Sequence, residues 1–143
     1  MIISPVTSQT TMTLADFYTE AAANFPEGSA GVPIAGRMLE LVEHLRDNVE
    51  GPQVWGLTGH LGLSLLGEDR ADSPSLVLIQ MRDTNDTRIP FGDPAGWSYV
   101  ISYTMADEGA PWPQARVVGE TFDVAEAGRR IVTALGRCAR PSA

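Results

Sequence analysis

The sequence predicts an α+β fold: a two-layer sandwich made of a three- to four-stranded antiparallel meander, two N-terminal helices and one C-terminal helix. Segments with helical periodicity lie near both ends of the 143-residue chain, and segments with a period of two lie between them. The loops between the period-two segments are too short for helical crossovers, so we expect antiparallel neighbours. Three helices comfortably cover only one face of such a sheet, which leaves the other face open.

The N-terminal part of the chain predicts a tail and a first helix. Residues 1–12 are rich in Ser and Thr and are expected to form a flexible tail before a single domain at residues 13–140. Thr13 is suited to cap a helix that runs to about Phe25, with Asp16 as an acidic residue in its first turn.

A second helix is predicted at residues 33–48. Its apolar residues recur with the spacing of one helical face, and Pro33 suits the first turn; the stripe is Ile34, Met38, Leu41, Val42 and Leu45. The opposite face is expected to be charged and solvated, and it carries Arg37, Glu40, Glu43, His44 and Asp47.

The middle of the chain predicts the strands. A single half-buried strand is expected between Trp55 and Leu66, with polar residues on its outer side: Thr58, His60, Gly62 and Ser64. Residues 75–82 are apolar on both faces, which indicates a central strand or an interface. Residues 97–105 alternate strongly, and residues 114–121 predict an edge strand.

The C-terminal segment predicts the third helix. Asp123 is placed to cap it, and Glu126 stands at the capping-box spacing. Cys138 falls on the apolar stripe of this helix, so we expect a buried, unreactive thiol rather than a nucleophile.

Composition excludes several kinds of function. All ten basic residues are arginine, so neither a lysine Schiff base, as in pyridoxal enzymes, nor a lysine-containing phosphate loop can form. This bias is typical of a GC-rich genome. A net charge of −8 disfavours nucleic acid and anionic membranes, and favours a basic protein partner. Without a secretion signal, a membrane-spanning stretch or a second cysteine, we expect a cytoplasmic protein.

Residue patterns predict no catalytic, metal or cofactor site. Glu40 and His44 are spaced for a metal, but no second histidine supports them. Residues 83–94 lack the glycine and glutamate of a calcium loop. His60, several serines and Arg116 are expected on the open sheet face, where His60 is the only acid–base candidate.

Trp112 stands between Pro111 and Pro113 in a predicted loop. A tryptophan held by two prolines loses little conformational freedom on binding, and tryptophan is enriched at binding hot spots. The alternative is that its ring folds over the edge of the core.

Three functional hypotheses follow from these observations. The first is a non-enzymatic protein-binding module, such as a small acidic adaptor, a chaperone or an immunity- or antitoxin-type inhibitor. It would bind through Trp112, Pro111 and Pro113, whereas His60 and Arg116 are the candidate binding residues of the open sheet face. The second is a small-molecule-binding protein or enzyme that uses the open sheet face. The third is a structural subunit that forms a homodimer or larger assembly through the strand at residues 75–82.

Overall fold

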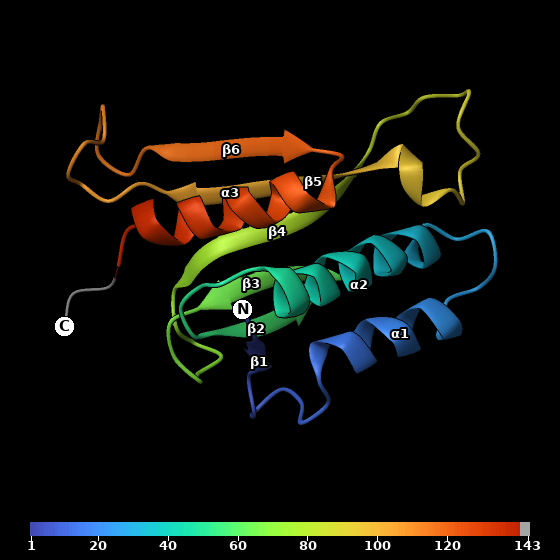
Figure 1. Ribbon diagram of the computed structural model, residues 1–143, viewed down its shortest axis with the longest axis horizontal. Helices are drawn as coiled ribbons and strands as arrows, with labels where there is room; N and C mark the ends of the chain where they lie inside the picture. Colours follow the sequence, from blue (N-terminus) through green and yellow to red (C-terminus); the bar gives the residue numbers. More distant parts are fainter. Residues whose placement is uncertain (141–143) are drawn as a thin grey trace.

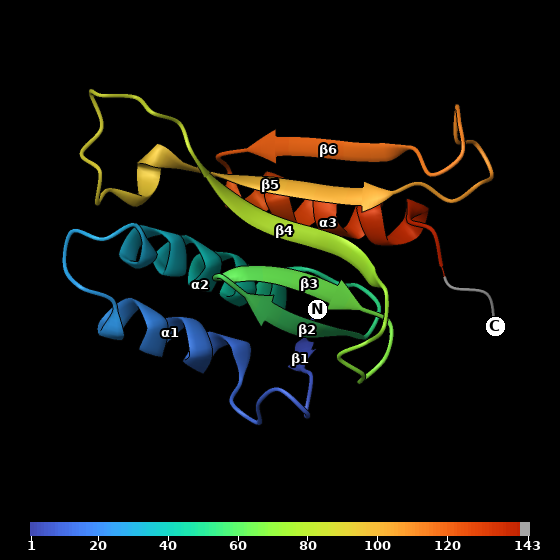
Figure 2. The same cartoon turned by 180° about the vertical axis from the view of Figure 1, so that it is seen from behind.

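A computed structural model describes residues 1–140 and contains a six-stranded sheet with three helices on one side (Figures 1 and 2). The predicted α+β class is therefore confirmed, but the predicted strand count of three to four is wrong. The strands lie in chain order across the sheet, and every neighbouring pair is antiparallel except the first. Within these residues, no helix is both long enough and apolar enough to cross a bilayer.

The elements follow one another in a simple order. The strands are β1 (Ile3–Pro5), β2 (Val54–Gly59), β3 (Gly62–Leu66), β4 (Ser75–Asp83), β5 (Trp97–Thr104) and β6 (Arg116–Thr121). The helices are α1 (Leu14–Asn24), α2 (Gly31–Asn48) and α3 (Val124–Arg137), and a single 3₁₀ turn, Pro94–Gly96, precedes β5. Of the helices, α1 packs mainly against α2, and it reaches the sheet at β1, at Gly56 of β2 through Leu14, and at the β2–β3 hairpin through the Tyr18 hydroxyl, which donates to the Leu61 carbonyl.

The first residues are part of the sheet, so the expectation of a flexible tail is wrong for this segment. Ile3 pairs in parallel with Val54 of β2, and Val6 is fully buried. Gly56 makes the close approach possible, because a Cβ there would lie 2.9 Å from side-chain carbons of Ile3 and Leu14. This pairing buries Ile3 and Val6. The sequence did not predict their burial, because the segment around them is rich in Ser and Thr.

The predicted strand between Trp55 and Leu66 is in fact a hairpin of two strands, β2 and β3. His60 and Leu61 form its turn, and both have positive φ values, 50° and 66°. Two consecutive left-handed residues match the twist of the flanking strands. The turn reverses the chain, so Leu57 and Ser64 lie opposite each other on the same face.

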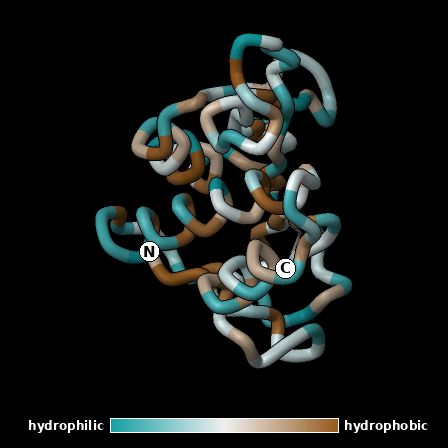
Figure 3. Tube along the Cα trace, turned by 90° about the vertical axis from the view of Figure 1, so that its right-hand side faces the viewer, coloured by the Kyte–Doolittle hydropathy of each residue, from teal (hydrophilic) through white to brown (hydrophobic). Residues whose placement is uncertain are grey.

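The core lies between the sheet and the helices, where the tube in Figure 3 carries many of its brown, hydrophobic segments. The predicted stripe of α2 contributes Met38, Leu41 and Leu45, all fully buried. The predicted N-caps are also confirmed, because the side chains of Thr13 and Asp123 accept hydrogen bonds from the first turns of α1 and α3. The structure gives Glu126 a different partner from the capping box, because it accepts from the Thr121 hydroxyl.

Arg37 does not lie on a solvated face of α2 as the sequence suggested. It is 8 % exposed, and its guanidinium lies 4.6 Å from the centre of the Tyr99 ring on β5. It donates to the carbonyls of Trp97 and Phe122 and pairs with Glu40 at 3.1 Å. The Tyr99 hydroxyl donates in return to the Arg37 carbonyl, and burial raises the pKa of that hydroxyl. The cluster ties α2 to β5 and to the segment between β6 and α3.

Candidate binding surface

The strand β6 is one outer edge of the sheet, and among residues 1–140 it pairs with β5 alone. The Met105 N–H donates to the Ala115 carbonyl. In an antiparallel pair, alternate residues of a strand bond to the neighbouring strand, so this bond fixes which residues of β6 bond to β5. Every second residue from Val117 onward therefore bonds to β5. The backbone groups of Arg116, Val118 and Glu120 point away from the sheet, and no strand in the described part of the chain pairs with them.

Side chains on the open face of β6 come from the same alternate residues. Arg116 donates to the hydroxyls of Ser102, at 2.9 Å, and Thr104. Glu120 accepts from the Ser98 hydroxyl at 2.8 Å and pairs with Arg82 at 3.2 Å. These bonds hold two charged side chains flat on the sheet and help to keep Ser98 and Ser102 buried. Val118, between them, is 65 % exposed.

Trp112 lies in the loop between β5 and β6 and is 63 % exposed, so its ring does not fold over the core. Pro111 and Pro113, on either side of it, are also exposed. Beyond them, Gln114 takes a left-handed conformation with φ of 58°, which turns the chain into β6. The loop thus presents the indole next to the start of the edge strand.

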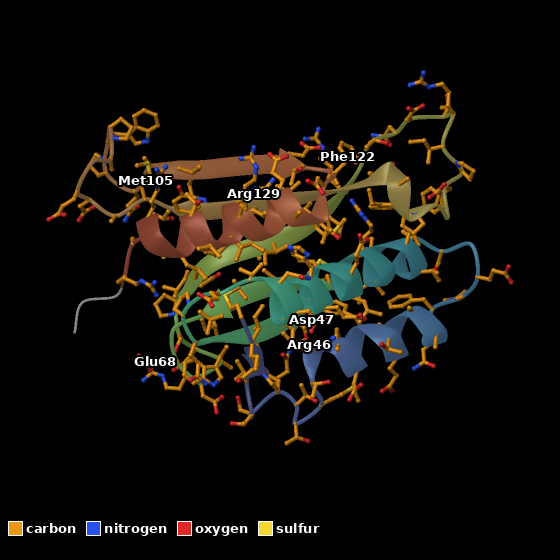
Figure 4. All side chains as sticks on the ribbon, in the orientation of Figure 1. Arg46, Asp47, Glu68, Met105, Phe122 and Arg129 are labelled. Atoms are coloured by element: carbon orange, nitrogen blue, oxygen red, sulfur yellow. The ribbon has the colours of Figure 1, made fainter. Side chains whose placement is uncertain are left out.

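Exposed apolar side chains gather along this edge. Among residues 1–140 there are six large exposed hydrophobic residues, and three of them, Trp112, Val118 and Phe122, come from one stretch of eleven residues. Figure 4 labels Phe122, which is 47 % exposed, just beyond the end of β6. We call these three side chains, with Arg116 and the free backbone edge of β6, the β6 surface.

The other face of β6 borders a groove beneath α3. This groove has a volume of about 330 Å³, and its walls include Val117, Gly119, Glu126 and three arginines: Arg129, Arg130 and Arg137. Figure 4 shows Arg129 on α3 beside β5 and β6. Gly119 leaves room for the guanidinium of Arg130, since a Cβ would lie 2.8 Å from its Nη1 atom.

The groove is bordered by one carboxylate and several cations. Glu126 pairs with Arg130 at 2.9 Å, and hydrogen bonds from Arg130 and from the Thr121 hydroxyl lower the pKa of the Glu126 carboxyl. Arg129 and Arg137 are exposed and have no carboxylate within 4.0 Å in the part of the chain that the structure describes. Their guanidinium groups are therefore free to bind an outside anion.

The structure separates the residues that sequence reasoning had grouped. His60 lies in the β2–β3 turn, beside an apolar hollow lined by Phe17 of α1 and by Phe25, which follows that helix. Because neighbouring strands from β2 to β6 are antiparallel, the end of β2 lies at the same end of the sheet as the start of β5. Trp112 follows the end of β5, so it lies at the opposite end of the sheet from the β2–β3 turn. Because His60 lies beside α1, on the helical side of the sheet, the expectation that it shares the open face with the serines is wrong. The serines on that face have no histidine beside them to act as a base.

No group of three His, Cys, Asp or Glu side chains within residues 1–140 is arranged to hold a metal ion. Glu40 instead pairs with Arg37, and the ring of His44 lies 3.4 Å from the amide of Asn48. Comparison of the chain with protein-family models, with characterised proteins and with solved structures finds no match. The local geometry is therefore the basis for a functional proposal.

Proposed function

We propose that this protein is a non-enzymatic protein-binding module that engages its partner through the β6 surface. The observation that carries the proposal is the coincidence of two features in one place. Exposed apolar side chains, led by Trp112, lie beside the unpaired backbone of an edge strand. Small acidic adaptors, chaperones and immunity- or antitoxin-type inhibitors are the classes of protein that this proposal covers.

An unpaired strand edge supports binding because an extended segment of another protein can add to the sheet. Main-chain hydrogen bonds then supply affinity, and side chains on either face supply specificity. Natural proteins often protect such edges with proline, bulges or short strands. The six residues of β6 contain no proline, and their pairing with β5 runs without a register shift. The charged side chains of Arg116 and Glu120 hydrogen-bond to serines of β5, so they do not block the free backbone groups of β6.

Trp112 supports the proposal from the adjoining loop. An indole that is already exposed has little protein contact to lose when it docks on a partner. The two flanking prolines restrict the backbone, which lowers the entropy lost on binding.

The two alternative functions receive less support. The serines of the open face have no histidine beside them, because His60 lies in the β2–β3 turn next to α1. The carboxylate that accepts from Ser98, Glu120, is itself paired with Arg82. Self-association through β4 is less favoured because β4 pairs with β3 on one side and β5 on the other, and because Leu76, Val77 and Ile79 are buried within the chain itself.

Site-directed photocrosslinking in the cells of origin tests this proposal. A photoreactive phenylalanine analogue replaces Trp112, or replaces Phe91 as a matched control. Phe91 is 54 % exposed and lies in the β4–β5 loop, at the other end of the sheet. We expect one protein to crosslink at position 112 and not at position 91. The additional substitution Val118→Arg should abolish this product.

The design has clear contrary outcomes. Identical products from both positions would mean that the crosslinks report only chance collisions. A specific product that survives Val118→Arg would place the contact elsewhere on the molecule. A small metabolite that copurifies with the protein, together with the absence of any protein product at position 112, would favour the alternative of a small-molecule-binding protein.

A further inference from the structure

The segment that contains β6 and α3 has a net charge opposite in sign to that of the whole chain. Residues 116–140 contain five arginines and three acidic residues, whereas residues 1–115 contain five arginines and fifteen acidic residues. Three of the five arginines in the first set border the groove between α3 and β6. The helical side of the β6 edge is therefore lined mainly by arginines, although the protein as a whole is acidic.

The geometry of the edge fixes where the side chains of an added strand would lie. Successive side chains of a strand point to opposite faces. One set would lie on the open face beside Val118 and Phe122, which are apolar and exposed. The other set would lie on the helical side, beside Val117 and Gly119 and under the arginines of α3.

We propose that the β6 edge binds an extended acidic segment of another protein, in which acidic and apolar residues alternate. The acidic side chains would pair with Arg129 and Arg137, which have no carboxylate partner in residues 1–140. The apolar side chains would cover Val118. This inference rests on the proposed function and adds the chemistry of the partner. It differs from the basic partner that the net charge alone suggests, because steering depends on the charge next to the contact.

A second copy of the chain fits this edge less well than an acidic segment. Pairing of β6 with β6 about a two-fold axis would place the two copies of α3 on the same side of a continuous sheet. The exposed arginines of one copy would then face those of the other across the axis. Such like-charge contacts oppose association.

Peptide binding measured by fluorescence anisotropy at low ionic strength tests the proposal. The probe is a short labelled peptide of alternating glutamate and valine. One control peptide has lysine in place of every glutamate, and a second has proline at its centre, which cannot complete the strand ladder. Each peptide is titrated with the full chain, with the double variant Arg129→Glu/Arg137→Glu, and with Arg70→Glu/Arg88→Glu. The last variant makes the same change in net charge at two exposed loop arginines away from β6.

We expect the full chain to bind the glutamate peptide about tenfold or more tightly than the lysine peptide. The α3 double variant should reverse this preference, and the loop double variant should keep it. The proline peptide should bind weakly to every form. Amide hydrogen exchange should slow at residues 116–121 when the glutamate peptide is bound, because the free backbone of β6 becomes paired.

Other outcomes overturn the proposal. An absence of preference between the two charged peptides, or equal effects of the two double variants, would show that the α3 arginines do not select the partner. A concentration-dependent dimer that Val118→Arg disperses would identify a second copy as the occupant. If the crosslink at position 112 forms while the α3 variant has no effect, protein binding at the β6 surface stands and only its acidic partner is wrong.

Discussion

Arg37 offers a sharp test of the fold because its side chain links three elements from a buried position. The variant Arg37→Ala would leave the carbonyls of Trp97 and Phe122 without this donor and would remove the cation from the Tyr99 ring. The alanine would also leave space where the arginine stem packs.

The expected loss of stability follows from these contacts. A hydrogen bond to a charged group contributes about 1.5–3 kcal/mol, and the bond to Trp97 is long, at 3.4 Å, and so counts little. The pair with Glu40 adds less than about 1 kcal/mol, because that carboxylate is half exposed. Together these give about 3 kcal/mol for Arg37→Ala. In a chain of this size 1 kcal/mol shifts the midpoint by about 3 °C, so Tm should fall by about 9 °C.

Thermal unfolding followed by circular dichroism measures this loss, with Arg46→Ala as the control. Arg46 lies on the same helix, but its partner is the exposed carboxylate of Asp47. Its loss should leave the midpoint unchanged within error. Equal midpoints for the two variants would refute the buried position of Arg37 and the link between α2 and β5. The variant Arg37→Met should recover part of the loss, since it restores apolar volume without a charge to bury.

Three further outcomes are expected. Gly56→Ala should lower the free energy of unfolding in urea by about 1–3 kcal/mol, because the new Cβ would lie 2.9 Å from apolar side-chain carbons. The control Gly59→Ala should change it little, because a Cβ there meets nothing within 4 Å. Equal losses in the two variants would argue against the packing of β1. Glu126→Gln should reduce the free energy of unfolding near neutral pH, because the pKa of this carboxyl is lowered in the folded state. As pH falls below about 4.5 the carboxylate is protonated, so the difference between the variant and the parent chain should vanish. A difference that persists in acid would contradict the pairing with Arg130. Trp112→Ala should leave the unfolding midpoint nearly unchanged, because the ring is exposed, while the affinity for the partner falls at least about tenfold. A loss of about 3–5 kcal/mol in the free energy of unfolding, as for a core tryptophan, would show instead that the ring is structural.

The sequence predicted the helices well because their signals are local. The caps at Thr13 and Asp123 and the apolar stripe of α2 depend on residues within a few turns of one another. The hairpin turn at His60 and Leu61 was missed because neither residue is a usual choice for a positive φ. The glycines on either side, Gly59 and Gly62, were the available signal that the strand pattern breaks there.

Arg37 was misplaced because its charge was given more weight than its position. It lies three residues after Ile34 and four before Leu41, which places it on the apolar side of the helix. In that position the Tyr99 ring and the Phe122 carbonyl stabilise the guanidinium. Those partners come from β5 and from the end of β6, so a local pattern could not reveal them.

The binding surface was predicted only in part. Trp112 and Arg116 were recognised from their residue types and from the loop and edge strand around them. The contribution of Val118 and Phe122 depends on β6 being an outer strand with its even-numbered side chains on the open face. The arginines of α3 join this surface only because the last helix packs along the same edge.

The parallel pairing of β1 with β2 has a consequence for the order in which the sheet assembles. Ile3 lies opposite Val54, so this contact closes only after both intervening helices have been positioned. Contacts between distant parts of a chain form late, whereas β2 to β6 are joined to their neighbours by hairpins and loops. Substitutions in β1 should therefore speed unfolding and leave the refolding rate almost unchanged. We therefore expect the N-terminal segment to complete one edge of the sheet last and the β6 edge to form early, and within residues 1–140 no strand covers the β6 edge.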